Sequence, residues 1–189
     1  MLDPTARPQV RLVPLVRFLA EREIEWVLTG STVLALHGGR LVPNDLDVAP
    51  RLDGDNLQRL AEALDDLDAV PAFVPEWGDM SGPEECRSWT PRPATEQNLD
   101  HMYVTRLGMV DVVPRICGRY DELVEHATTV DIAGVPVAVC ALSAVLDRLR
   151  GRGRAKDVQR AAIYADLEQR STAGPTPDAL GWLLDQLPG

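Results

Sequence analysis

The amino-acid sequence predicts a mixed α/β (α+β) fold, with a small mixed β-sheet, flanking helices and a helical C-terminal part. Two observations carry this prediction. Short apolar runs typical of buried strands alternate with amphipathic helical patterns over residues 1–140, whereas residues 141–189 carry helical periodicity alone. A chain of 189 residues, 45% of them hydrophobic, is long enough to bury one sizeable core. We therefore divide it into a core region, 1–140, and a helical region, 141–189.

Hydrophobic spacing predicts the first elements of the chain. Apolar residues recur at helical intervals over 8–22, which predicts an amphipathic helix. The run EWVLT at 25–29 is typical of a short buried strand, and Ser31 suits the N-cap of a helix that ends at Gly38-Gly39. The later elements expected on the same grounds are a strand at 46–50, a helix at 57–67, a β-hairpin on either side of Gly108, a strand at 135–141 and C-terminal helices at 142–149, 155–169 and 177–187.

Residues 71–98 interrupt this pattern. Five of the fifteen prolines lie there, together with Trp77 and Trp89. Proline removes a backbone hydrogen-bond donor and restricts φ, so we expect a long loop or insertion. The two tryptophans either anchor this loop to the core or offer a ring to a base or a partner protein.

Composition and charge exclude several classes of function. Lysine and arginine total 19 against 29 acidic residues, and the net charge of -10 argues against non-specific nucleic-acid binding by the whole surface. The three cysteines are widely spaced and form no CxxC motif, so we expect reduced thiols and no zinc site. No apolar run approaches membrane length, and the N-terminus has no apolar signal segment. We expect a soluble, cytoplasmic protein with no membrane partner.

Two aspartates one residue apart, Asp45 and Asp47, form the first candidate site. Side chains alternate along a strand, so both carboxylates point to one face while Leu46 and Val48 point to the core. Adjacent carboxylates repel unless a cation lies between them, and Mg²⁺ commonly takes one or two carboxylates and completes its shell with water and phosphate. Such a pair on a surface strand can also be simply solvated.

A Gly-Ser turn precedes this pair. Gly30 and Ser31 follow the first expected strand and open a helix, where backbone N–H groups lack partners and favour an anion. Glycine allows a phosphate to approach the backbone, and serine can donate a further hydrogen bond. The alternative is that the turn only caps the helix.

A third acidic residue, Asp111, stands in the otherwise apolar run MVDVVP. A buried acid is costly unless it is paired or bound to a metal, and a neighbouring strand could place this one beside the Asp45/Asp47 pair. Asp100 is a competing candidate from the other strand of the hairpin. We prefer Asp111 because its neighbours are uniformly apolar.

Together these residues resemble the nucleotidyltransferase superfamily, which has the DNA polymerase β-like fold. Its pattern is a Gly-Ser turn, an Asp-x-Asp pair and a third Asp on a nearby strand, matched here by Gly30-Ser31, thirteen intervening residues, Asp45/Asp47 and Asp111. The resemblance implies that the Asp pair holds Mg²⁺ and a nucleoside triphosphate (NTP). It also implies that Asp111 completes a second metal site and helps to deprotonate the attacking hydroxyl, while the Gly-Ser turn holds the triphosphate.

The C-terminal segment DRLRGRGRAKDVQRAAIYADL narrows the resemblance to the AbiEii/MenT-type nucleotidyltransferase toxins. Lys156 and Asp157 match the Lys-Asp pair of that group and are implied to contact the nucleotide, Lys156 as a catalytic cation. The resemblance makes 1–140 the catalytic core. It implies transfer of a nucleotide, often a pyrimidine, to the 3′ end of tRNA, a block of translation, and a cognate antitoxin as partner.

The same segment carries the strongest cationic cluster of an acidic chain. An RNA backbone could be bound there through salt-sensitive contacts, although a solvated helix end is the simpler explanation. The four arginines considered for RNA binding are Arg148, Arg150, Arg152 and Arg154.

Three other functions remain open at this stage. The acidic surface would also suit an aminoglycoside-type small-molecule acceptor, and the same site could transfer a nucleotide to a protein side chain (AMPylation). A degenerate fold used only for binding is the non-enzymatic alternative.

Two further residues, Tyr164 and Asp166 on the second C-terminal helix, are possible neighbours of the nucleotide.

Overall fold

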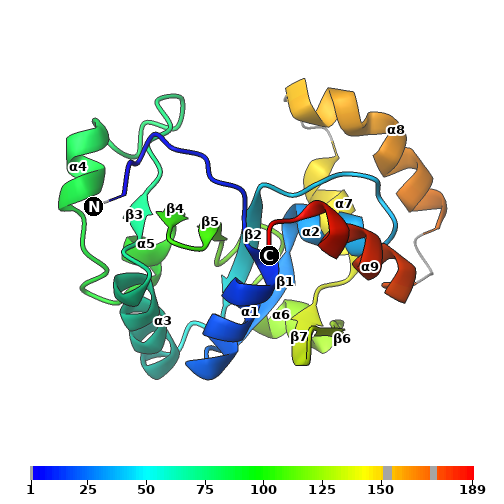
Figure 1. Ribbon diagram of the computed structural model, residues 1–189, viewed down its shortest axis with the longest axis horizontal. Coiled ribbons are helices and arrows are strands. Elements are labelled where there is room, and N and C mark those ends of the chain that lie inside the picture. Colours follow the sequence, from blue (N-terminus) through cyan, green and yellow to red (C-terminus); the bar gives the residue numbers. More distant parts are fainter. Residues whose placement is uncertain (1, 151–154, 171–173) are drawn as a thin grey trace.

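The computed structural model describes residues 2–150, 155–170 and 174–189, and the Lys156 side chain lies outside the described part. Within these residues a seven-stranded mixed sheet runs through the centre of the molecule in the order β3-β4-β5-β2-β1-β7-β6 (Figure 1). The strands are β1 (Trp26–Thr29), β2 (Asp45–Pro50), β3 (Val70–Pro71), β4 (Met102–Thr105), β5 (Gly108–Val112), β6 (Thr128–Ile132) and β7 (Val135–Val139).

Strand pairing brings distant parts of the chain together at the middle of the sheet. β1 pairs with β2 in antiparallel register, and β2 pairs with β5 in parallel register. β4 and β5 form the hairpin expected at Gly108, and β7 lies parallel to β1 on the other side. The α/β prediction is confirmed. β2 lies between β1, from the first half of residues 1–140, and β5, from the second half.

Helices gather at both ends of the sheet (Figure 1). α3, α4 and α5 lie at the β3 end, whereas α7, α8 and α9 lie at the opposite end, where α2 contacts both α7 and α9. The helices are α1 (Leu12–Glu21), α2 (Gly30–Leu36), α3 (Gly54–Asp66), α4 (Pro83–Ser88), α5 (Glu96–Leu99), α6 (Tyr120–Glu125), α7 (Leu142–Leu149), α8 (Ala155–Gln169) and α9 (Pro177–Gln186).

The first helix begins later than the sequence pattern predicts. Helix α1 buries its apolar face but starts at Leu12 rather than at residue 8. The preceding residues pair elsewhere: the Val10 N–H donates to the Asn44 carbonyl at 2.9 Å, and the Arg11 N–H donates to the Leu107 carbonyl at 2.9 Å. These bonds hold the N-terminal segment against the loops around β2 and β5, so it cannot extend the helix.

Asn56 connects α3 to the ends of the central strands. Its side chain is fully buried, accepts from the Glu25 N–H at 2.8 Å and donates to the carbonyls of Glu25 and Arg51 at 2.9 Å each. The N-cap residue Asp53 accepts from the Asn56 N–H at 3.0 Å. A buried amide satisfied in this way fixes where α3 leaves β2.

Two expectations about the chain are corrected. Ser31 is not an N-cap: α2 already begins at Gly30, and Thr29 occupies the cap position. The stretch 71–98, expected to be a long loop or an insertion, is not a plain loop, because it contains α4 and most of α5. Within it Trp89 packs against Tyr103, with ring centroids 5.1 Å apart, as the core-anchor alternative expected.

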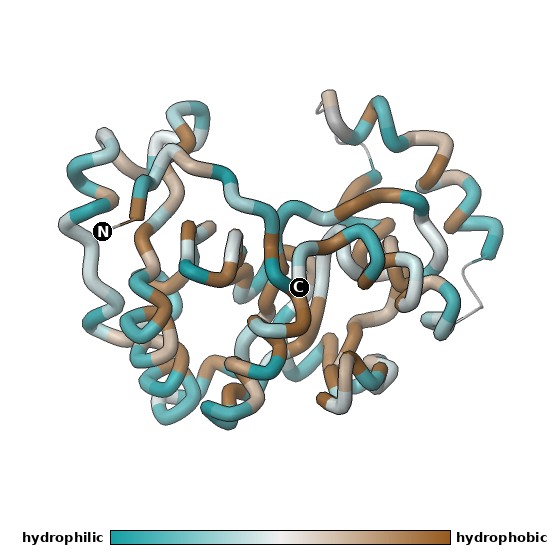
Figure 2. Tube along the Cα trace, viewed as in Figure 1, coloured by the Kyte–Doolittle hydropathy of each residue, from teal (hydrophilic) through white to brown (hydrophobic). Residues whose placement is uncertain are grey.

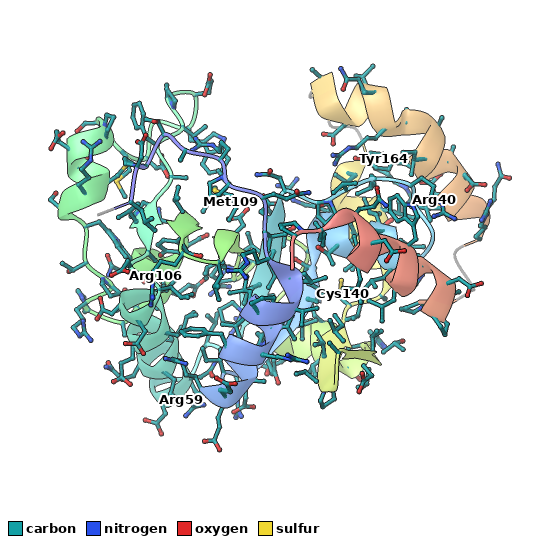
Figure 3. The ribbon with its side chains drawn as sticks, viewed as in Figure 1. Arg40, Arg59, Arg106, Met109, Cys140 and Tyr164 are labelled. Atoms are coloured by element: carbon teal, nitrogen blue, oxygen red, sulfur yellow. The ribbon has the colours of Figure 1, made fainter. Side chains whose placement is uncertain are left out.

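One hydrophobic core extends from the sheet into the C-terminal helices. Hydrophobic residues run through the central strands (Figure 2), and Cys140 is among the buried side chains of this core (Figure 3). Leu146, Leu167 and Leu183 of the last three helices belong to the same buried cluster as the strand residues. No helix among the described residues has the length and apolar character needed to cross a bilayer.

Candidate active site

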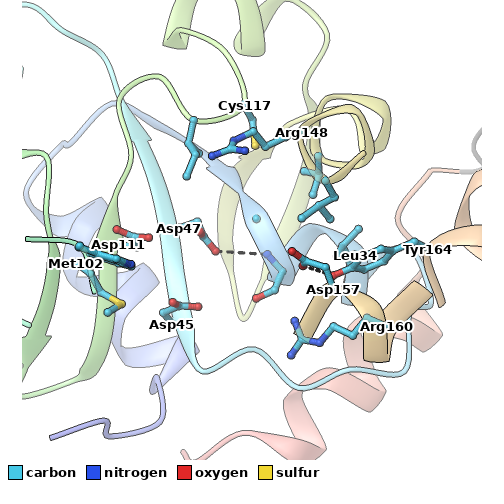
Figure 4. A pocket seen from close by; sticks show the side chains of 16 residues that line it. Leu34, Asp45, Asp47, Met102, Asp111, Cys117, Arg148, Asp157, Arg160 and Tyr164 are labelled. Atoms are coloured by element: carbon cyan, nitrogen blue, oxygen red, sulfur yellow. Dashed lines mark hydrogen bonds between the residues drawn. The ribbon is translucent and has the colours of Figure 1, made fainter. Parts of the chain in front are cut away.

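A cavity of about 540 Å³ opens between the central strands and helices α7 and α8 (Figure 4). It contains most of the described residues that the sequence singled out, and several that it did not. The lining residues are Gly30, Ser31, Leu34, Asp45, Asp47, Trp77, Met102, Asp111, Ile116, Cys117, Val145, Arg148, Leu149, Asp157, Arg160 and Tyr164.

Three carboxylates form one wall of this cavity, which we call the sheet wall. Asp47 of β2 is the direct partner of Asp111 in the parallel β2–β5 pair, and Asp45 lies two residues earlier on the same face of β2. All three are half-buried, whereas the alternating residues Leu46 and Val48 are fully buried. Strand alternation places Asp45 and Asp47 on one face, and the β2–β5 pairing adds Asp111, as expected. Asp100 lies outside the cavity, at the C-terminal end of α5.

The carboxylate oxygens of the sheet wall suit a hard divalent cation that is also bound by phosphate oxygens. Among the described residues no group of three or more His, Cys, Asp or Glu side chains is arranged so that it could hold a metal ion. Mg²⁺ commonly binds through one or two carboxylates and fills its other positions with water and phosphate oxygens. The carboxylates of Asp45 and Asp47 fit such a shared site, in which a nucleotide supplies the remaining ligands.

The Gly-Ser turn lies directly against this wall. The Ser31 N–H donates to Asp47 Oδ2 at 3.4 Å. Gly30 has φ of +67°, and a Cβ at this position would lie 1.9 Å from the same carboxylate oxygen. Only glycine combines the left-handed conformation with this close approach. The turn therefore positions the Asp47 carboxylate, a role that the sequence did not suggest.

Helices α7 and α8 supply the opposite side of the cavity, which we call the helical wall (Figure 4). Arg148 comes from α7, and α8 contributes Asp157, Arg160 and Tyr164. Asp157 is buried and accepts from the Tyr164 hydroxyl at 3.2 Å. Partial burial and the charge of Asp157 raise the pKa of Tyr164. Asp157 thus lies at the cavity, as expected.

Arg160 was not predicted, although its spacing carried a signal. Residues 157, 160 and 164 recur at helical intervals, and a helix places residues three and four apart on one face. With Asp157 assigned to the site, Arg160 and Tyr164 follow from this periodicity. The other helix residue considered, Asp166, pairs with Arg170 at 3.0 Å outside this cavity.

The protein is similar to known proteins in its structure. No family model matches the sequence, and no curated protein matches it. A nucleotidyltransferase-like antigenic protein from Paracoccidioides brasiliensis is similar in structure, with a TM-score of 0.50 and 16% identity over 92% of this chain and 84% of that chain. The fold is nucleotidyltransferase-like. The antibiotic-resistance factor ANT(2'')-Ia was also found, with a TM-score of 0.48 and 12% identity over 93% of this chain and 90% of that chain.

Within this nucleotidyltransferase-like fold the arginines of the basic segment have different surroundings. Arg148 is partly buried and lines the cavity. Arg150 is exposed and forms ion pairs with Asp147 at 2.8 Å and Glu168 at 3.4 Å. Arg152 and Arg154 lie outside the described residues, as does the side chain of Lys156.

Cys117 also lines the cavity. Its thiol is a free cysteine whose pKa is raised to about 11, first by burial and then by the negative charge of Asp47. Burial likewise raises the pKa of Cys140 to about 12. A raised thiol pKa disfavours the reactive thiolate at neutral pH.

Proposed function

We propose that the protein is a divalent-metal-dependent nucleotidyltransferase that transfers a nucleoside monophosphate from an NTP to a hydroxyl acceptor. The observation that carries the proposal is the arrangement of the cavity. Three half-buried carboxylates on two hydrogen-bonded strands face one space, and the arginines Arg148 and Arg160 line the same space from α7 and α8. Separated charges of opposite sign suit a metal–triphosphate complex, which carries both positive and negative groups.

The reaction assigns a separate role to each wall. Asp45 and Asp47 would hold Mg²⁺, which when bound neutralises phosphate charge and orients the triphosphate. The acceptor oxygen attacks the α-phosphorus, the bond from that phosphorus to the bridging oxygen breaks, and pyrophosphate leaves. Asp111 accepts the proton of the attacking hydroxyl, and the family resemblance implies that it would also contribute to a second metal position. Asp111 is suited to this role by its place, because it is half-buried and lies on β5 directly opposite Asp47.

The helical wall provides the positive charge for the leaving group. Arg148 and Arg160 are the described cationic side chains that line the cavity. Guanidinium groups bind phosphate through paired N–H donors, and they stabilise charge as it develops on pyrophosphate. We assign Lys156 the same role because of its place in the sequence beside Asp157.

The acceptor we favour is the 3′-hydroxyl of tRNA, and the biological role is that of a toxin restrained by a cognate antitoxin. The sequence resemblance of 147–167 to the AbiEii/MenT-type toxins supports this part of the proposal. Transfer of a nucleotide, in this group often a pyrimidine, would leave the acceptor end extended and unable to be charged, so translation would stop.

A labelling experiment tests the proposal. Purified protein, Mg²⁺, total tRNA and each α-³²P-labelled NTP in turn are incubated, and the RNA is resolved on a sequencing gel. We expect one labelled tRNA band that EDTA abolishes and that Asp47→Asn loses. Asp55→Asn, which changes an exposed aspartate outside the cavity, is the matched control and keeps the activity.

Parallel reactions replace tRNA with an aminoglycoside or with a protein mixture. Label on the aminoglycoside would show that the acceptor is a small molecule. Label on a protein would indicate AMPylation. Absence of transfer to every acceptor by a folded protein would contradict the enzymatic proposal and favour a binding module.

A further inference from the structure

Trp77 is exposed although it lines the cavity. It is 55% exposed, and it is the one aromatic residue among the large, exposed hydrophobic side chains of the described residues. Trp89, from the same proline-rich stretch, behaves differently, because its ring packs against Tyr103 and His101. A tryptophan ring buries a large apolar area when it can, so an exposed ring inside a cavity is available to a ligand.

The loop that carries Trp77 is held on both sides. The Trp77 N–H donates to the Val74 carbonyl at 3.0 Å, and the nearby Met80 side chain is buried. Asp79 Oδ2 lies 3.6 Å from Nδ1 of the half-buried His101. The Trp77 ring therefore stands on a turn that is held by a backbone hydrogen bond and a buried neighbouring side chain, and it is exposed although this segment is ordered.

The segment that carries Trp77 follows β3, which pairs with β4, and the Ala72 N–H at the start of this segment donates to the Met102 carbonyl at 2.7 Å. The described arginines of the cavity come from α7 and α8, which draw the triphosphate toward the helical wall. Met102, which also lines the cavity, is the direct strand partner of Asp111 on β4. Figure 4 shows Met102 and Asp111 together, across the cavity from Arg160 and Tyr164. An acceptor hydroxyl that reaches Asp111 thus approaches from the side of Met102.

We propose that Trp77 is a stacking platform for an unpaired base at the 3′ end of a nucleic-acid acceptor, with Met102 forming the apolar floor beside Asp111. This inference rests on the proposed nucleotidyl transfer and specifies its acceptor as single-stranded at its end. Bases stack on aromatic side chains without regard to sequence, because every base has a π-face. The acidic surface of the chain offers little attraction to a phosphate backbone, so stacking supplies binding that charge does not.

Steady-state kinetics with a short RNA acceptor provide the first test. Trp77→Ala should raise the KM for the acceptor by about tenfold or more, while the KM for the NTP stays the same. Trp77→Phe should keep most of the affinity, because a smaller ring still stacks. Val124→Ala, which trims an exposed apolar side chain on α6 outside the cavity, is the control and should match the wild type. An unchanged acceptor KM in Trp77→Ala, or a rise confined to the NTP, would overturn the proposal.

A binding measurement separates this inference from the proposed function, because it needs no turnover. Titration with a single-stranded oligonucleotide should quench the fluorescence of the wild type, and the same oligonucleotide with an abasic 3′-terminal nucleotide should quench it less. Trp77→Phe should lose most of this quenching. If the protein transfers no nucleotide but the quenching is present, the proposed function fails and the stacking platform stands. If transfer occurs without base-dependent quenching, the platform is wrong and the enzyme assignment stands.

Discussion

The two walls of the cavity differ in how their side chains are held. On the sheet wall, Asp47 and Asp111 are direct partners of two hydrogen-bonded strands, and buried leucine and valine residues alternate with the carboxylates. On the helical wall, Arg148 and Arg160 stand on separate helices that pack through side chains. The spacing of the carboxylates is fixed by the register of the paired strands. The spacing of the arginines depends on how α7 and α8 pack against each other and against the core.

This difference suits two distinct chemical tasks. Carboxylates that share a metal must keep their spacing throughout the reaction, and a register of paired strands provides it. Cations that bind a triphosphate and then release pyrophosphate benefit from elements that can shift. The comparison therefore predicts that changes on the sheet wall act on turnover and that changes on the helical wall act on nucleotide affinity.

Asp111→Asn should give the largest effect. The amide cannot accept the proton or carry the charge of the carboxylate, so we expect turnover to fall by about a thousandfold or more, with the fold intact. Asp100→Asn, at the C-terminal end of α5 outside the cavity, should leave turnover within about twofold of the wild type. A comparable loss of turnover in Asp100→Asn would show that the carboxylate of Asp111 has no special role in catalysis.

Gly30→Ala should destabilise the protein by about 3 kcal/mol and also abolish most activity. The added Cβ would require left-handed strain at φ of +67° and would meet the Asp47 carboxylate at 1.9 Å. Gly38→Ala is the matched control, because Gly38 has φ of +90° but no atom within 4 Å of an added Cβ, and it should cost about 1 kcal/mol. Urea denaturation measures both, and equal losses would show that the carboxylate contact does not matter.

Alkylation of Cys117 tests whether the thiol beside Asp47 is buried and has a raised pKa. Because burial and Asp47 raise its pKa from 9.0 to about 11, the native thiol at pH 8 should react about a hundredfold more slowly with iodoacetamide than in urea. A raised thiol pKa contributes stability that is complete below the unfolded pKa of about 9 and is lost as pH rises toward 11. Mass spectrometry of the labelled peptides measures the rate, and rapid native labelling at pH 8 would contradict this account.

Arg160→Gln should give the smallest of these effects. Loss of one guanidinium from the helical wall should raise the KM for the NTP by about tenfold with a smaller change in turnover. Arg170→Gln removes the arginine that directly follows α8 and pairs with Asp166 outside this cavity, so it should behave as the wild type does. A turnover defect as large as that of Asp111→Asn would mean that the two walls are not divided in function.

The sheet wall could be predicted from sequence because strand alternation is a local rule. The spacing of Asp45 and Asp47 places them on one face, and the apolar neighbours of Asp111 mark it as a strand residue. The parallel pairing of β2 with β5 then aligns Asp47 with Asp111. That register is a tertiary property, which the apolar surroundings of Asp111 and the family resemblance indicated but the sequence pattern alone could not fix.

Other features depended on information that is not local. β6 was missed because it is an edge strand whose side chains are mostly exposed, so it has no apolar run. The short helices α4 and α5 escaped detection because six and four residues are too few to show periodicity. The contact between Gly30 and Asp47 arises from the β1–β2 pairing, which brings Thr29 opposite Asp47.

The most direct test of the central claim is a crystal structure with Mg²⁺ and an NTP analogue that cannot be cleaved at the α–β bridge. We expect the metal at about 2.0–2.1 Å from carboxylate oxygens of Asp45 and Asp47. We also expect its shell to be shared with phosphate oxygens, and the β- and γ-phosphates to lie toward Arg148 and Arg160. A nucleotide bound outside this cavity, or a metal held without either carboxylate, would contradict the account.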